Sequence, residues 1–126
     1  MARTAGTTTT APTPIAPYSQ SVRIGNLVAA SGQAGIDPAT GTFAAPDVAG
    51  QTTQTFKNIA AVLEASGATL DDVIRVDVYL SDMADFAAMN EAYAQVFSQP
   101  YPARTTVGVS LPAGMKVEIT ALAVTN

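Results

Sequence analysis

One arginine in this chain stands where a strand is expected to begin. The stretch YPARTTVGVSL (residues 101–111) places Arg104 between a proline turn and an alternating apolar run, although the whole sequence has only 6 basic residues. Glu118 lies in the last apolar run between Val117 and Ile119, so it should project away from the helices, where an unpaired charge is costly. A planar guanidinium suits two-pronged binding of a carboxylate. The two residues therefore predict either a site for a small carboxylate or an Arg–Glu ion pair at a subunit interface.

Several other side chains could do chemistry, but each has a simpler structural explanation. Asp82 and Asp85, like the pair at 71–72, could bind a hard cation, yet carboxylates are also expected as caps where a helix begins. Lys116 could form a Schiff base, although a solvated strand lysine is the preferred interpretation. Asn90 interrupts an apolar helical stripe, which by itself indicates a hydrogen-bonded core amide. The glycines of residues 31–41 lack the spacing of a dinucleotide-binding loop, so no phosphate site is predicted.

The composition of the chain excludes several classes of function. Without histidine or cysteine there is no Ser-His-Asp triad, no thiol nucleophile and no ordinary zinc or iron site. A net charge of -4 and a pI near 4.4 argue against a nucleic-acid partner, because phosphate binding needs clustered Lys and Arg. No apolar run is long enough for a membrane span, so a cytoplasmic protein without a membrane partner is expected.

The order of the expected elements is ββαβαββ. Residues 1–14 are polar and of low complexity and predict a flexible N-terminal arm, followed by a single domain over residues 15–126. Gly25-Asn26 is expected to form a hairpin turn, and DPATG (residues 37–41) a second turn. Helical spacing predicts helices over 47–66 and 83–97. Alternating apolar residues predict strands near 73–80, 107–111 and 115–124.

These elements predict an α+β fold in which one mixed β-sheet carries two helices on one face. The strand at 73–80 alternates, with Ile74, Val76, Val78 and Leu80 expected on the helix-covered face. Yet apolar residues also fall on the opposite face of the predicted strands. A sheet that is apolar on both faces and covered on one needs a further surface, most simply a copy of itself. We therefore expect a homo-oligomer. The residues assigned to the uncovered face are Val73, Tyr79, Leu122 and Val124.

Several stretches of the chain together resemble the RidA/YjgF family of enamine/imine deaminases. The resemblance covers nearly everything after Pro14 and does not depend on one motif. It implies a chorismate-mutase-like α+β fold and a homotrimer whose clefts lie between subunits. The stretches, in order, are APYSQSV (16–22), SGQ (31–33), DPATG (37–41), NIAAVLEASGATLDDVIRVDVYLSDM (58–83), YPART (101–105) and KVEITALAV (116–124).

The resemblance also implies roles for particular residues. The arginine of the PAR motif, here Arg104, would hold the substrate carboxylate, and the glutamate of the last strand, Glu118, would position or activate water. The residues that would line the cleft and bind substrate are Tyr18, Ser31, Gly32, Asn90 and Thr106.

Two departures from the family pattern concern the cleft rim. Well-studied members often carry cysteine two residues after the arginine, where this chain has Thr106. The loop before Leu111-Pro112 is one residue shorter than the more familiar form. Both changes bear on substrate preference more than on the chemistry.

The resemblance implies hydrolysis of reactive enamines and imines, such as 2-iminobutanoate and 2-iminopropanoate, to 2-keto acids and ammonia. This reaction requires no metal, organic cofactor or covalent intermediate, which suits a chain without His and Cys. Three alternatives stay open: a non-catalytic protein that binds 2-keto acids or other small carboxylates, a ribonuclease or translation inhibitor, and a holdase-type chaperone. The acidic composition argues against the ribonuclease.

Overall fold

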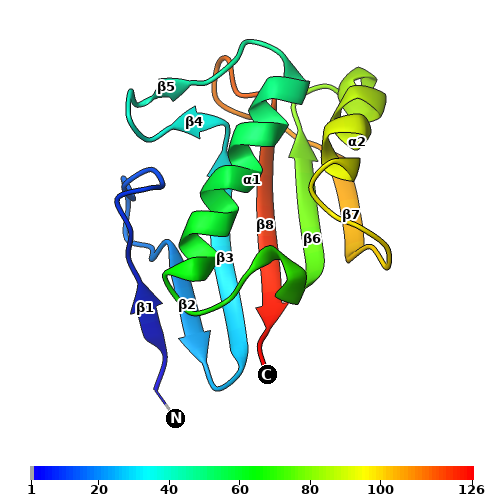
Figure 1. The fold of residues 1–126 in the computed structure, drawn as a ribbon. Helices are drawn as coiled ribbons and strands as arrows, with labels where there is room; N and C mark the ends of the chain where they lie inside the picture. The colour runs from blue at the N-terminus through cyan, green and yellow to red at the C-terminus, as the bar shows by residue number, and fades with distance from the viewer. Residues whose placement is uncertain (1) are drawn as a thin grey trace.

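The computed structural model describes residues 2–126 as a six-stranded sheet with two helices on one face (Figure 1). The order in the sheet is β1-β2-β3-β8-β6-β7, and only the β6–β7 pair is parallel. Strands β4 and β5 form a separate small hairpin. The α+β class, the mixed sheet and the placement of both helices are confirmed. The elements are β1 (Thr4–Gly6), β2 (Ser21–Ile24), β3 (Leu27–Ala34), β4 (Ile36–Asp37), β5 (Thr42–Phe43), α1 (Val48–Glu64), β6 (Val73–Leu80), α2 (Phe86–Ala94), β7 (Ala103–Gly108) and β8 (Val117–Val124).

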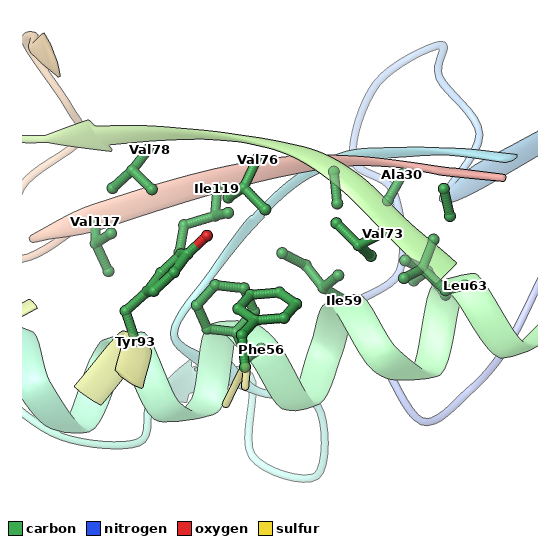
Figure 2. Close-up of a cluster of buried hydrophobic side chains, with 14 of the residues drawn as sticks. Ala30, Phe56, Ile59, Leu63, Val73, Val76, Val78, Tyr93, Val117 and Ile119 are labelled. Carbon is green, nitrogen blue, oxygen red and sulfur yellow. The ribbon is translucent and has the colours of Figure 1, made fainter. Parts of the chain in front are cut away.

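Helix α1 supplies much of the core. The Asp47 side chain accepts a hydrogen bond from the Gly50 N–H and caps its first turn. Gly67, with φ of 83°, follows its last turn in the left-handed conformation that favours glycine. The predicted helix over 47–66 is thus confirmed, with its regular part ending at Glu64. Its buried side chains pack against the sheet around Val76, Val78, Val117 and Ile119 (Figure 2). The fully buried apolar residues of α1 include Phe56, Ile59, Val62 and Leu63.

Helix α2 is shorter than the helix predicted over 83–97. Residues 83–85 form a 3-10 turn, and the α-helix spans Phe86–Ala94. Met89 and Tyr93 are buried under it, whereas Met83 and Phe86 are 45% and 40% exposed. The apolar spacing could not distinguish a 3-10 turn from an α-helix at residues 83–85, because a 3-10 turn also brings residues i and i+3 to one side.

A bulge in β6 reverses one part of the predicted face assignment. The pairing of β6 with β8 shifts register between Val73 and Arg75. As a result Val73 is buried at 7% exposure, and Ile74 is 52% exposed. The predicted core position of Ile74 and uncovered position of Val73 were therefore wrong. From Val76 onward the alternation is as predicted, with Tyr79 on the uncovered face.

The N-terminal residues form structure where a flexible arm was predicted. Thr4–Gly6 pairs with β2, and Ala11 is buried at 2% exposure. The buried Gln20 side chain holds the segment between them: its amide donates to the Thr8 and Pro12 carbonyls and accepts from the Thr8 N–H. The polar composition did not indicate an ordered N-terminal segment, because its hydrogen bonds are made to strand β2 and to the Gln20 side-chain amide, which lie farther along the chain.

The face of the sheet opposite the helices is uncovered and partly apolar, as predicted. Register places one row of apolar side chains there, among them Leu27 at 43% and Val107 at 40% exposure. Such a surface suits self-association; the homotrimer stays a prediction. No helix within residues 2–126 has the length and apolar character to cross a membrane. The row comprises Leu27, Tyr79, Val107, Leu122 and Val124.

Candidate functional site

Arg104 lies on β7 at the edge of the sheet, beside α2. Its pairing with Val76 of β6 places its side chain on the helix-covered face. The guanidinium carbon lies 4.7 Å from the ring centroid of Tyr93 and 5.7 Å from that of Phe86. Within residues 2–126 the only ion pair joins Arg75 to Asp77, so no carboxylate of the described chain neutralises Arg104. The guanidinium borders a cavity of about 340 Å³ lined by Asn90, Tyr93, Ala94, Tyr101, Pro102 and Arg104.

Three buried polar atoms around Arg104 lack hydrogen-bond partners. They are the Asn90 Oδ1, the Tyr93 hydroxyl and the Thr106 Oγ1, none of which is bonded within the described residues. Burial raises the pKa of the Tyr93 hydroxyl, with Arg104 lowering it and Tyr101 raising it by smaller amounts. Buried polar groups are normally paired. The Asn90 Oδ1 lines the cavity beside the free guanidinium, which is the arrangement expected of a site that binds a polar ligand. Asn90 is thus a cavity residue rather than a hydrogen-bonded core amide.

Glu118 lies on β8 against the backbone of β3. A Cβ at Gly32 would lie 3.0 Å from the Glu118 Oε2, so glycine gives this carboxylate room to rest on the strand. The neighbouring Ser31 hydroxyl donates to the Ser19 carbonyl, and the Ser31 N–H donates to the Gln20 carbonyl. These bonds hold the segment that carries the 47% exposed Tyr18. Gly32 therefore lies against Glu118, and Tyr18 directly precedes Ser19, whose carbonyl binds the Ser31 hydroxyl.

The structure does not bring Arg104 and Glu118 together within one chain. Glu118 pairs with Tyr79, whereas Arg104 pairs with Val76. Side chains of adjacent paired residues share a face, and successive residues of a strand alternate between faces. Tyr79 lies three residues from Val76, so Glu118 projects from the uncovered face and Arg104 from the helix-covered face. The candidate residues therefore form two groups: Arg104 and Thr106 on the helix-covered face with Asn90 of α2, and Glu118 with Gly32 on the other face.

Two of the remaining acidic candidates, Asp82 and Asp72, cap turns. The Asp82 side chain accepts from the Ala84 N–H, and the Asp72 side chain accepts from the Thr69 N–H and hydroxyl. These are caps, as the alternative to cation binding predicted. Lys116 lines a separate cavity, beside the buried Gln51.

Two aromatic residues at the site were not predicted to be there. Tyr93 and Phe86 both face the Arg104 guanidinium, and both had been assigned only to the apolar stripe of a helix. Their spacing with Asn90, at i, i+4 and i+7, places all three on one side of α2. The sequence contained this alignment, but only the pairing of β7 with β6 shows that Arg104 lies opposite it.

Comparison with known proteins assigns the chain to a family. The model of the Endoribonuclease L-PSP family matches residues 8–125. A RutC family protein of Pyrococcus horikoshii is 51% identical over 92% of this chain and 93% of its own length. A 2-iminobutanoate/2-iminopropanoate deaminase of Dermatophagoides farinae is 43% identical over 90% of each chain. The crystal structure of E. coli TdcF with bound serine superposes with a TM-score of 0.91 at 38% identity, covering 98% of this chain and 99% of TdcF. The chain therefore belongs to the Endoribonuclease L-PSP family, the RidA/YjgF family that its motifs resemble.

Proposed function

We propose that this protein hydrolyses 2-iminobutanoate and 2-iminopropanoate to 2-keto acids and ammonia. The observation that carries the proposal is the Arg104 guanidinium, which borders a cavity and has no carboxylate partner among residues 2–126. A guanidinium without a carboxylate partner can bind the carboxylate that every 2-imino acid carries. The deaminase name of the Dermatophagoides relative supports the choice of substrate.

The proposed reaction needs a held substrate and an oriented water molecule. Arg104 binds the carboxylate, which fixes the position of the adjacent C2 atom. The water oxygen bonds to C2 while Glu118 accepts a water proton and the C=N electron pair moves to nitrogen. Glu118 returns that proton to the nitrogen, which gives a C2 atom carrying both a hydroxyl and an amino group. The hydroxyl proton then moves to the same nitrogen, the C–N bond breaks as the C=O bond forms, and ammonia leaves. One water is consumed and no atom changes its oxidation state, so no oxidant or reductant is involved.

A site that uses both residues must be assembled from two copies of the chain. Arg104 and Glu118 project from opposite faces of one sheet, and the face that carries Glu118 is uncovered and partly apolar. Packing that face against the β7 edge of a second copy would place the Glu118 of one copy near the Arg104 of the next. The homotrimer implied by the family resemblance supplies such contacts in a closed ring.

A mixed assembly tests this arrangement directly. Arg104→Ala and Glu118→Gln subunits, each nearly inactive alone, are refolded together in equal amounts. In a cyclic assembly of random composition, about one quarter of the clefts then combine an intact Arg104 with an intact Glu118. The imine-hydrolysis rate per subunit is expected to recover to about a quarter of the wild-type rate. A rate no higher than the mean of the two separate variants would place both residues of a working site in one chain.

The Thr106 hydroxyl is expected to be dispensable for turnover. Its oxygen is buried without a hydrogen-bond partner in the described chain, so no base activates it as a nucleophile. Thr106→Val keeps the shape and removes an unpaired polar group, which is neutral or stabilising when the hydroxyl makes no bond. Both this variant and Thr106→Cys should keep most of the activity, and the unfolding midpoint of Thr106→Val should be no lower than that of the wild type. A loss as large as that of an Arg104 variant would show that the hydroxyl takes part in the reaction.

The function itself is tested by a coupled assay. A pyridoxal-phosphate dehydratase acting on threonine or serine supplies the short-lived imine, and the appearance of the 2-keto acid is followed with and without this protein. The proposal expects a faster appearance that depends on protein concentration. Binding of the 2-keto acid without any acceleration would instead support the non-catalytic carboxylate-binding alternative.

A further inference from the structure

The Arg104 guanidinium rests on aromatic rings rather than on a counter-ion. Tyr93 lies under it at 4.7 Å and Phe86 at 5.7 Å, both measured from the guanidinium carbon to the ring centroid and both within cation–π range. No side-chain hydrogen bond or ion pair engages its N–H groups within residues 2–126. The positive charge is therefore held in place while its donors stay available.

The Tyr93 ring is itself fixed by the core. It is 5% exposed and lies edge-on to Phe56, with centroids 5.6 Å apart and planes at 76°. Phe97 also contacts it, at 5.1 Å between centroids and with the planes tilted by 46°. Figure 2 shows the Tyr93 ring reaching from α2 toward the sheet beside Phe56. A ring wedged in this way offers a rigid platform, which a solvated side chain could not.

The hydroxyl of Tyr93 does not explain its position. It makes no hydrogen bond within the described residues, and burial raises its pKa, so it stays neutral and cannot balance the charge of Arg104. What Arg104 meets is the face of the ring, which carries the negative part of the aromatic quadrupole.

We propose that Tyr93, assisted by Phe86, is a positioning residue that holds the Arg104 guanidinium flat against α2 with its N–H edge open to the substrate carboxylate. A carboxylate in this place would hold Arg104 equally well, but it would occupy the donors that the substrate needs. An aromatic ring below the guanidinium plane attracts the positive charge and leaves the N–H donors, which lie in the guanidinium plane, unused. The inference rests on the proposed role of Arg104 as the carboxylate anchor.

The test compares a ring-keeping with a ring-removing substitution. Tyr93→Phe keeps the ring and is expected to bind 2-oxobutanoate as the wild type does. Tyr93→Leu removes it and is expected to weaken that binding roughly 3- to 30-fold, from the size of a desolvated cation–π contact. In Tyr93→Leu the KM for the imine should rise by a similar factor, while kcat changes little. Binding is measured by titration calorimetry, with 2-oxobutanamide as the uncharged ligand whose affinity should not change.

A matched control separates positioning from core damage. Phe97→Leu removes a ring from the same aromatic cluster but not from the surroundings of Arg104. It should lower the unfolding midpoint much as Tyr93→Leu does and leave 2-oxobutanoate binding unchanged. If Tyr93→Leu does not fold, Phe86→Leu decides the question, because Phe86 is 40% exposed and its loss should cost roughly 2- to 5-fold in binding. The proposal is overturned if Tyr93→Leu and Phe97→Leu weaken 2-oxobutanoate binding equally. It is also overturned if Tyr93→Leu, or Phe86→Leu where Tyr93→Leu does not fold, leaves that binding unchanged.

A measurement without ligand keeps this inference separate from the proposed function. In the wild type, the Tyr93 ring current should displace the Arg104 Nε–H resonance upfield, and Tyr93→Phe should preserve the displacement. Its absence in the wild type would refute the stacking, whatever the protein hydrolyses. A displaced resonance in a protein that binds no 2-oxobutanoate would refute the carboxylate-anchor role on which the proposed function depends.

Discussion

Glu118→Gln is expected to lower kcat for imine hydrolysis roughly 100-fold, the lower end of what a positioned general base contributes. The amide keeps the shape of the carboxylate and still fits against Gly32, where the structure leaves room for its oxygens. It can no longer accept a proton from water. Binding of 2-oxobutanoate should be unchanged, because the carboxylate of the ligand is held by Arg104. Steady-state kinetics beside titration calorimetry separate the two effects.

The control for this variant is a glutamate elsewhere on the surface. Glu91→Gln makes the same chemical change on α2, at an exposed position with no part in the proposed site, and kcat should stay at the wild-type value. A Glu118→Gln protein that keeps full turnover would remove Glu118 from the chemistry and leave substrate binding by Arg104 untouched.

Arg104→Lys is expected to reduce kcat/KM roughly 10- to 100-fold, from the loss of a hydrogen bond to a charged group. Lysine keeps the positive charge but presents a compact ammonium, which cannot make the planar two-pronged contact with a carboxylate. It also stacks less well on Tyr93 than a guanidinium does. Because no carboxylate of the described chain pairs with Arg104, the unfolding midpoint should hardly change.

The corresponding control is Arg75→Lys, an exposed arginine on β6 whose nearest acidic partner is Asp77 at 3.4 Å. Its kinetic constants should match those of the wild type, since surface ion pairs contribute little to stability.

Dissociation or unfolding of both site variants would instead give Arg104 and Glu118 a structural role. If Arg104→Lys and Glu118→Gln both cause the assembly to dissociate or unfold, the two residues form an ion pair between subunits, because breaking a buried pair costs several kcal/mol.

The local elements of this fold could be predicted because their causes are local. The spacing of Phe56, Ile59 and Leu63, with Asp47 before and Gly67 after, was sufficient to place α1. The turn at Gly25-Asn26 was correct, and Gly25 adopts the left-handed φ of 57° that such a turn requires. The alternation in β8 identified which of its residues face the helices. In each case the deciding interactions lie within a few residues along the chain.

The face of the sheet on which a strand residue lies depends on pairing with distant segments, and the prediction of these faces failed in part. A bulge of one residue exchanged the environments of Val73 and Ile74, because the register of β6 is fixed by its hydrogen bonds to β8. Strand β1 was missed for the same reason. The segment Thr4–Gly6 becomes a strand only where the edge of β2 offers it partners.

The sequence by itself therefore determined which residue types could do chemistry, a guanidinium at Arg104 and a carboxylate at Glu118, and most of the helices and strands that carry them. Only the tertiary structure decided how these residues are related. The parallel pairing of β7 with β6 brought Arg104 under α2 and onto the ring of Tyr93, and the antiparallel pairing of β8 turned Glu118 to the other face. Sheet order and register are set by hydrogen bonds between segments far apart in the chain, and no local pattern of residues records which segments will meet.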